Sequence, residues 1–143
     1  MRLSAKAEYA CIAMFELTLN YGEPQPARVK SIAEAHGIPP RFLVQILLQL
    51  KAAGLVMSTR GAAGGYQLVR PPDKISLADV VNAIDREPAV RTSPVAAQAS
   101  AASQALHSVW HEMQDAEQRM LREVSLAELA QRAQRTSALS YQI

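Results

Sequence analysis

Three side chains with groups suited to reading bases recur at intervals of about one helix turn: Arg41, Gln45 and Gln49. Residues four apart share a face of an α-helix. A guanidinium near the start of such a helix can pair with both guanine acceptors in the major groove, and a glutamine amide can pair with adenine or a phosphate. Arg60, further along, suits a narrow minor groove, where negative potential is concentrated. The pattern predicts base recognition in duplex DNA.

The charge distribution favours the same chemistry. Residues 27–70 contain six Lys or Arg side chains and one acid, so they carry +5, whereas the whole chain carries +2. Polar and basic groups on phosphate oxygens would set register and salt dependence without reading sequence, although any one of them could equally be an ordinary solvated side chain. For this role we expect Arg2, Ser4, Lys6, Arg28, Lys30 and Lys51. Gly61 and Tyr66, in the segment after Arg60, complete the expected DNA contacts.

Other chemistries receive less support from the sequence. His107 and His111 stand four apart with Glu112 nearby, a spacing that can hold a metal ion, but no third ligand is evident. The glycine-rich segment 61–65 lacks the G-x-x-x-x-G-K-[ST] order and precedes a predicted strand, so it is not a phosphate loop. No nucleophile, base and orienting group occur at recognisable spacing. We therefore predict neither an enzyme nor a metal site.

The elements that must position these residues follow from apolar spacing. Helices are predicted from Ser4 to about Asn20, over about eight residues ending at His36-Gly37, and from Pro39-Pro40 to Gly54. The third helix has apolar positions that pack inward and leave Arg41, Gln45 and Gln49 on the other side: Leu43, Ile46, Leu47 and Leu50.

Two short β-prone runs follow, over 55–60 and 66–70, and their glycine-rich connection predicts a hairpin whose tip needs positive φ angles. Ser76 and Asp79 resemble a capping box that opens a fourth helix. Helix, turn, helix and hairpin in this order predict a mainly α fold, a winged helix-turn-helix with a two-stranded wing, whose second helix enters the major groove.

The C-terminal part differs in character. Residues 87–102 are predicted to be a linker or sensor loop, and a long helix is predicted from about Ser103. This helix has an apolar stripe remote from the core, which predicts that a partner helix covers it. A second copy of the chain is the simplest partner. The expected dimer contacts are Leu106, Val109, Trp110, Met113 and Met120. A capping box at Ser125 and Glu128 predicts a last short helix, with a loose tail from Thr136. The predicted organisation is a DNA-binding domain over 1–86, the loop over 87–102, and a dimerisation helix with a C-terminal helix over 103–143.

Length and composition set further bounds. A chain of 143 residues with 49% hydrophobic content can bury one core. No export signal or run of about 20 apolar residues is visible, so we expect a cytoplasmic protein with no membrane contact. The lone cysteine, Cys11, excludes an internal disulfide and a site of several thiolates, and is expected to be a small buried hydrophobe.

Several motifs together resemble one family. They are Met1-Arg-Leu-Ser-x-Lys-x-x-Tyr-Ala, Gly37-Ile38, Phe42-Leu43-x-Gln45-Ile46-Leu47, Arg60-Gly-x-x-Gly-Gly-Tyr66-Gln-Leu, and Ile75-Ser-Leu-x-Asp-Val-Val-x-Ala-Ile-Asp85. In nearly the whole chain the sequence resembles the Rrf-two (Rrf2) family of bacterial regulators. The resemblance implies a homodimer, held by the long C-terminal helix, that binds a palindromic operator. It also implies that Arg41, Phe42 and Gln45 touch the major groove and Arg60 the minor groove.

The chain departs from the family at one point. Members that bind an iron-sulfur cluster have three cysteines before the long helix, and the matching residues here, about 92–104, contain none. The resemblance leaves two other ligand positions, Glu8 and His107, which cannot hold a cluster without thiolates. We therefore expect no cofactor and a regulator, a repressor or dual regulator, that responds to a small molecule or a partner protein. The alternatives are a winged-helix module that binds proteins, and a cluster- or metal-dependent sensor whose cysteines have been replaced.

Overall fold

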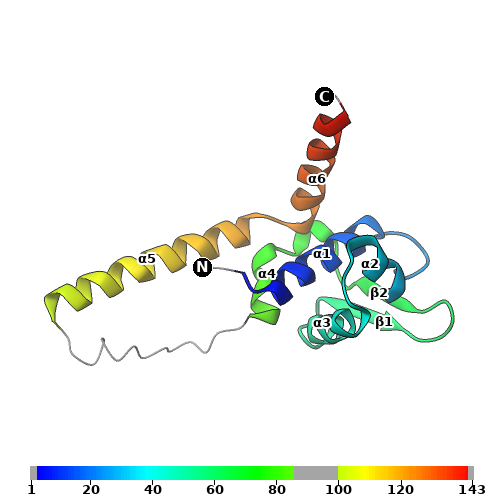
Figure 1. Cartoon of the computed structure of the whole chain (residues 1–143), viewed down its shortest axis with the longest axis horizontal. Helices are drawn as coiled ribbons and strands as arrows, with labels where there is room; N and C mark the ends of the chain where they lie inside the picture. Colours follow the sequence, from blue (N-terminus) through cyan, green and yellow to red (C-terminus); the bar gives the residue numbers. More distant parts are fainter. Residues whose placement is uncertain (1–2, 86–99, 142–143) are drawn as a thin grey trace.

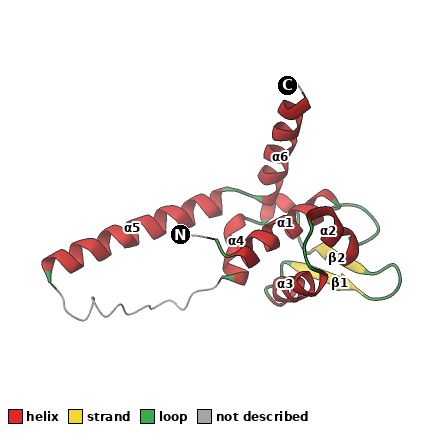
Figure 2. Cartoon of the chain, viewed as in Figure 1, coloured by secondary structure: helices red, strands yellow, loops and turns green. Residues whose placement is uncertain are grey.

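In the computed structural model, the structure describes residues 3–85 and 100–141. Most of the predicted loop, 87–102, therefore lies outside the described residues. Helices dominate, and the one sheet of the described part has two antiparallel strands (Figure 2). The mainly α winged helix-turn-helix prediction is confirmed.

The first three helices form where the apolar spacing placed them: α1 (Ala5–Leu19), α2 (Val29–His36) and α3 (Pro40–Ala52). The hydroxyl of Ser4 caps α1 by accepting a hydrogen bond from the N–H of Ala7. Gly37, in the left-handed region at φ 64°, ends α2 and starts the turn. The turn can therefore be sharp enough to pack α3 against α2.

The wing consists of β1 (Val56–Thr59) and β2 (Gly65–Leu68), with Val56 opposite Leu68 and Thr59 opposite Gly65. Of the three glycines at its tip, only Gly61 has positive φ, at 107°. The other two need glycine for a different reason: a Cβ on Gly64 would collide with the carbonyl oxygen of Thr59, and one on Gly65 with that of Ala27. The prediction of positive φ at the tip was thus right only for Gly61.

After the wing come a 3-10 turn, η1 (Pro72–Lys74), and α4 (Leu77–Ile84), which opens with the predicted capping box between Ser76 and Asp79. The long helix α5 (Ala101–Glu123) begins two residues earlier than expected because Ser100 caps it. The last helix, α6 (Leu126–Tyr141), is not short, and it continues through Thr136. The predicted loose tail is therefore wrong.

Only half of the expected capping box forms at the start of α6. The hydroxyl of Ser125 accepts from the N–H of Glu128, but the Glu128 carboxylate accepts from Arg132, one turn on. The α5–α6 junction is held to the winged helix by the backbone: the N–H of Leu77 donates to Val124, and that of Leu126 donates to Ile75.

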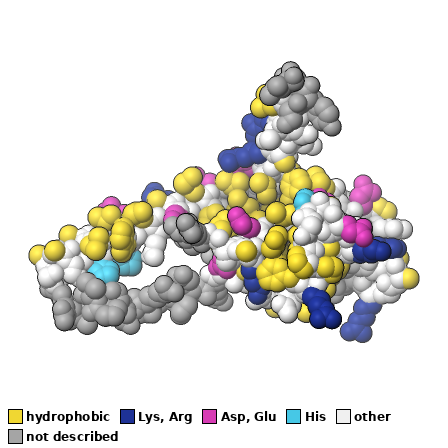
Figure 3. All heavy atoms as spheres, in the orientation of Figure 1, with side chains coloured by type: hydrophobic (Ala, Val, Ile, Leu, Met, Phe, Trp, Pro, Cys, Tyr) yellow, Lys and Arg dark blue, Asp and Glu magenta, His cyan; other side chains and the backbone are white. Residues whose placement is uncertain are grey.

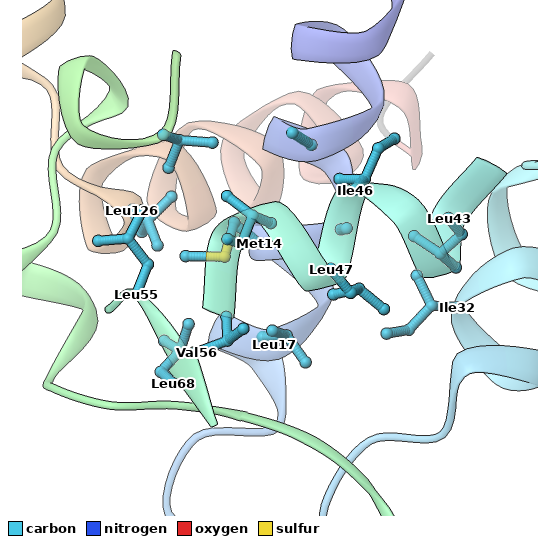
Figure 4. Packing of buried hydrophobic residues seen from close by; sticks show 14 of the residues in the cluster. Met14, Leu17, Ile32, Leu43, Ile46, Leu47, Leu55, Val56, Leu68 and Leu126 are labelled. Atoms are coloured by element: carbon cyan, nitrogen blue, oxygen red, sulfur yellow. The ribbon is translucent and has the colours of Figure 1, made fainter. Parts of the chain in front are cut away.

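The core lies between α1, α3, α4 and the wing, and it includes the start of α6 (Figure 4). In the described part of the chain, the largest fully buried side chains are Met14, Leu17, Leu43, Ile46, Leu47, Leu50, Ile75, Val80, Val81 and Leu126. All four α3 positions that were predicted to pack inward are in this set. Leu126 shows that the C-terminal part returns to the N-terminal core after α5 rather than forming a separate body.

Helix α5 extends away from this core as an arm (Figure 1). Near its own C-terminal end, α5 contacts α4. None of the helices in the two described ranges is long and apolar enough to span a bilayer.

Candidate nucleic-acid interface

Two contacts fix α2 and α3 relative to the core. Ile38, in the turn, is 2% exposed, and its N–H donates to the carbonyl of Ala33. At the end of α2, the His36 ring nitrogen lies 2.7 Å from a Glu16 carboxylate oxygen on α1, with both side chains about three-quarters buried. The helix-turn-helix is therefore tied to α1 by apolar packing and by a polar contact.

The outer face of α3, as we use the term, consists of four exposed residues: Arg41, Val44, Gln45 and Leu48. Among the described residues, the guanidinium of Arg41 has no hydrogen-bond or ion-pair partner. Because the opposite side of the helix is fully buried, this face is the one that α3 can present to another molecule. The prediction that Arg41 and Gln45 lie outside the core is confirmed.

Two other α3 residues that were expected to contact DNA, Phe42 and Gln49, are partly buried. The ring of Phe42 is half-buried and packs edge-on against Tyr9, with the ring centroids 5.6 Å apart. Gln49 is also half-buried, and its Oε1 atom is enclosed without a hydrogen-bond partner in the described residues. The exposed part of α3 is thus narrower than predicted, because Gln49 is only partly accessible.

The wing presents a second exposed group. Arg60 and Gly61 are exposed at its tip, and Arg60 has no charged or hydrogen-bonded partner within residues 3–85 and 100–141. Tyr66 is half-buried instead, and its backbone exchanges two hydrogen bonds with Ala27, of 2.8 and 3.0 Å. Those bonds attach the wing to the segment before α2, so Arg60 projects from a supported hairpin.

The cations expected on phosphates have mixed surroundings. Arg28 is exposed at the start of α2, and Lys30 is exposed with its Nζ 4.0 Å from a Glu34 carboxylate oxygen. The Nζ of Lys51 donates to the Ser58 hydroxyl at 2.7 Å and so links α3 to β1. In the space-filling view, dark blue Lys and Arg atoms protrude from the edges of the winged helix (Figure 3).

The N-terminal candidates differ again. Lys6 is half-buried on α1, and Arg2 lies outside the described residues. Ser4 is exposed, but its hydroxyl donates its proton to the Asp85 carboxylate, whose two oxygens lie 2.7 and 2.8 Å away. Because the same hydroxyl also caps α1, Ser4 joins the start of α1 to the end of α4.

The two non-cysteine ligand positions do not form a metal site in the described part of the chain, where no group of three His, Cys, Asp or Glu could hold an ion. Glu8 is exposed on α1, and His107 is half-buried on α5, with its Nε2 enclosed and unpartnered among the described residues. Burial, and then the charges of Asp85 and Glu8, raise the pKa of the Cys11 thiol to about 11. Iron-sulfur clusters are held mainly by thiolates, so this donor set does not fit one.

All five expected dimer contacts on α5 are exposed, and we call them the α5 stripe: Leu106, Val109, Trp110, Met113 and Met120. Their exposed fractions run from 47% to 70%. Yellow hydrophobic atoms follow the arm in Figure 3. Sequence reasoning missed Val44 and Leu48 on the outer face of α3, although their spacing from Arg41 and Gln45 indicates the same face.

Comparison with known proteins agrees with this architecture. Residues 3–132 match the family model Rrf2, described as an iron-dependent transcriptional regulator. An HTH-type transcriptional regulator of Mycobacterium tuberculosis, Rv1287, is 42% identical over 91% of this chain and 81% of its own. The HTH-type transcriptional regulator CymR of Bacillus subtilis is 34% identical over 91% of this chain and 90% of its own.

Solved structures give the same result. The structure of T. potens IscR superposes with a TM-score of 0.76 and 33% identity, over 93% of this chain and 88% of that one. The structure of CymR, the global cysteine regulator of B. subtilis, gives 0.77 and 31%, over 92% and 97%. The fold, the helix-turn-helix and the relatives' names agree, and the chain therefore belongs to the Rrf2 family of DNA-binding transcriptional regulators, which are not enzymes.

Proposed function

We propose that this chain is a homodimeric repressor whose two winged helices bind the half-sites of a palindromic operator without an iron-sulfur cluster. The observation that carries the proposal is the outer face of α3, where Arg41 is exposed and unpartnered among the described residues. A recognition helix reads bases through such side chains, which the fold holds in place without using them. Acting on DNA, the protein would function in the cytoplasm.

Each exposed group then has a role in recognition. Arg41 pairs with the O6 and N7 atoms of a guanine, and Gln45, one turn on, with an adenine or a phosphate. Arg60, at the tip of the wing, enters the neighbouring minor groove. Arg28 and Lys30, at the start of α2, contact phosphate oxygens and contribute to salt dependence.

The dimer is supported by the α5 stripe. From Leu106 to Met120 it covers 14 residue steps, or about 21 Å of helix. Apolar patches of this kind on an extended helix mark interaction sites, and two antiparallel or crossed copies of the arm would cover each other. Recognition helices of such a dimer would lie about 34 to 36 Å apart, or a multiple of this, to meet half-sites one turn apart.

Sedimentation and the single tryptophan, Trp110, test the dimer. Trp110 is 50% exposed in the protomer, so its emission should shift to shorter wavelength as concentration rises and α5 pairs. Val109→Glu should give a monomer. Gln104→Glu adds the same charge on a different side of α5 and should remain dimeric. A wild-type monomer at all concentrations would contradict this part of the proposal.

DNA recognition is tested by selecting bound duplexes from genomic fragments and measuring affinity for the recovered and random duplexes. The logarithm of the binding constant should fall linearly with that of salt, by about 0.9 per phosphate contacted. Negligible DNA binding would favour the alternative, a winged helix that holds another protein. A reporter that stays equally active with and without the regulator would contradict repression.

The cluster-free part of the proposal follows from the donors. Cys11 is the only cysteine, whereas cluster iron requires several thiolates, and burial raises the pKa of its thiol to about 11, which disfavours the thiolate further. After anaerobic incubation with iron and sulfide, the protein should show no cluster absorbance, and its operator affinity should change less than twofold. A stable coloured species with altered affinity would contradict it. A small molecule or partner protein then remains as the effector.

A further inference from the structure

The outer face of α3 includes two aliphatic side chains beside its polar ones. Val44 is 39% exposed and Leu48 is 52% exposed, while the inward positions of the same helix are 0% exposed. A single exposed aliphatic residue needs no explanation. Here, however, both lie on the face that also carries Arg41 and Gln45, and neither belongs to the buried core cluster. A molecule that fits this face would therefore offer apolar surface between polar groups.

The major groove offers that combination at one base. Thymine presents its C5 methyl group beside its O4 acceptor, and apolar side chains contact this methyl in direct readout. Val44 follows Arg41 by three residues, which places it about 4.5 Å further along the helix axis. This is slightly more than the 3.4 Å between successive bases on one strand. Val44 is also in the first half of α3, the part of a recognition helix that meets base edges.

We propose that Val44 contacts the C5 methyl of a thymine in each half-site, next to the base pair that Arg41 reads, and so selects T at that step. This inference rests on the proposed function. Leu48 is one turn nearer the C-terminal end of α3, away from the base edges, and has no assigned role in this selection. The structure thus assigns an apolar specificity contact that adds to those of Arg41 and Gln45.

The effect expected from one methyl contact is small but measurable. Burying one methyl-sized group corresponds to about a fourfold change in the binding constant. Two symmetric half-sites would give about 15-fold when both contacts are lost. Val44→Ala should not disturb folding, because the side chain is exposed and alanine favours helix.

The experiment uses the full-length protein and the duplex that it enriches most strongly from a random library. Each thymine of the half-sites is replaced in turn by deoxyuridine, which removes the methyl and leaves the base pair intact. Fluorescence anisotropy then gives Kd for wild type, Val44→Ala and Leu48→Ala. Replacing one particular thymine in both half-sites should weaken wild-type binding about 15-fold. The same replacement should leave Val44→Ala binding unchanged and should still weaken Leu48→Ala binding.

The possible results distinguish a failure of the Val44 contact from a failure of the proposed function. If no duplex is enriched, the proposed function fails and this inference fails with it. If a duplex is enriched but no deoxyuridine weakens wild-type binding, or if the loss persists in Val44→Ala, Val44 has no methyl contact although the regulator binds DNA. A loss that disappears only in Leu48→Ala would move the contact to Leu48 and overturn the assignment.

Discussion

Replacing Arg41 by alanine is the sharpest test of how α3 reads DNA. The guanidinium has no partner in the described part of the chain, so the substitution removes nothing that we see holding the fold. Surface changes of this kind alter the free energy of unfolding by less than about 0.5 kcal/mol. A change in DNA binding can then be attributed to the interface.

The expected magnitude follows from the contact. A bidentate arginine on guanine is worth about 1 to 3 kcal/mol of discrimination, so a dimer with two half-sites should lose about 2 to 6 kcal/mol of specific binding free energy. Affinity for random duplexes should fall far less, because there the substitution removes only the attraction of the Arg41 charge to phosphate groups. Anisotropy titrations of operator and random duplexes at one salt concentration measure both quantities.

Arg70 provides a matched control. Its guanidinium donates to the carbonyl of Lys74 and pairs with Asp79 at 3.3 Å, so it is engaged within the fold. Arg70→Ala should lower stability slightly and leave the ratio of operator to random affinity unchanged. If Arg41→Ala reduces both affinities equally, Arg41 acts only as a charge and the base-reading role is refuted.

Three further predictions concern the scaffold. Leu126→Ala should lower the free energy of unfolding, measured by urea denaturation, by about 2 to 5 kcal/mol because Leu126 is fully buried. Leu139→Ala, at a 62% exposed position, should change the free energy of unfolding little, and equal effects of the two substitutions would contradict the return of α6 to the core. Gly65→Ala should lower the thermal midpoint because its Cβ would collide with the Ala27 carbonyl, and an unchanged midpoint would show that the wing can shift. The pKa of the Cys11 thiol is raised from 9.0 to about 11, so the contribution of the thiol to stability is present below pH 9 and is lost as pH rises toward 11. Between these pH values, wild type should therefore lose more stability than Cys11→Ala. Parallel curves of stability against pH for the two proteins would contradict the burial of the thiol.

Local patterns were sufficient to predict most of the fold. The helices over 4–20 and 29–36 were predictable because their caps and apolar spacing are encoded within a few residues of each other. The inward row of α3 was predictable for the same reason. Arg41 and Gln45 lie opposite that row, so their exposure followed from it.

Long-range contacts were not predictable in the same way. Ser4 meets Asp85 across 81 positions of sequence, so nothing near Ser4 indicates that its hydroxyl is already engaged. Leu126 returns to the core after the 23 residues of α5, whereas the sequence favoured a separate C-terminal unit. Gln49 has the spacing of an outer residue, but its side chain is half-buried and its Oε1 atom is enclosed. These outcomes depend on tertiary packing, which spacing does not encode.

The proposed function places the outer face of α3 in the major groove of the operator. Methylation interference tests it most directly, because dimethyl sulfate modifies guanine N7, the major-groove atom that Arg41 is proposed to contact. We predict that methylating one guanine in each half-site blocks binding of the wild type and has little effect on Arg41→Ala. Binding that is insensitive to every guanine N7, or equally sensitive in both proteins, would show that Arg41 does not contact guanine in the major groove.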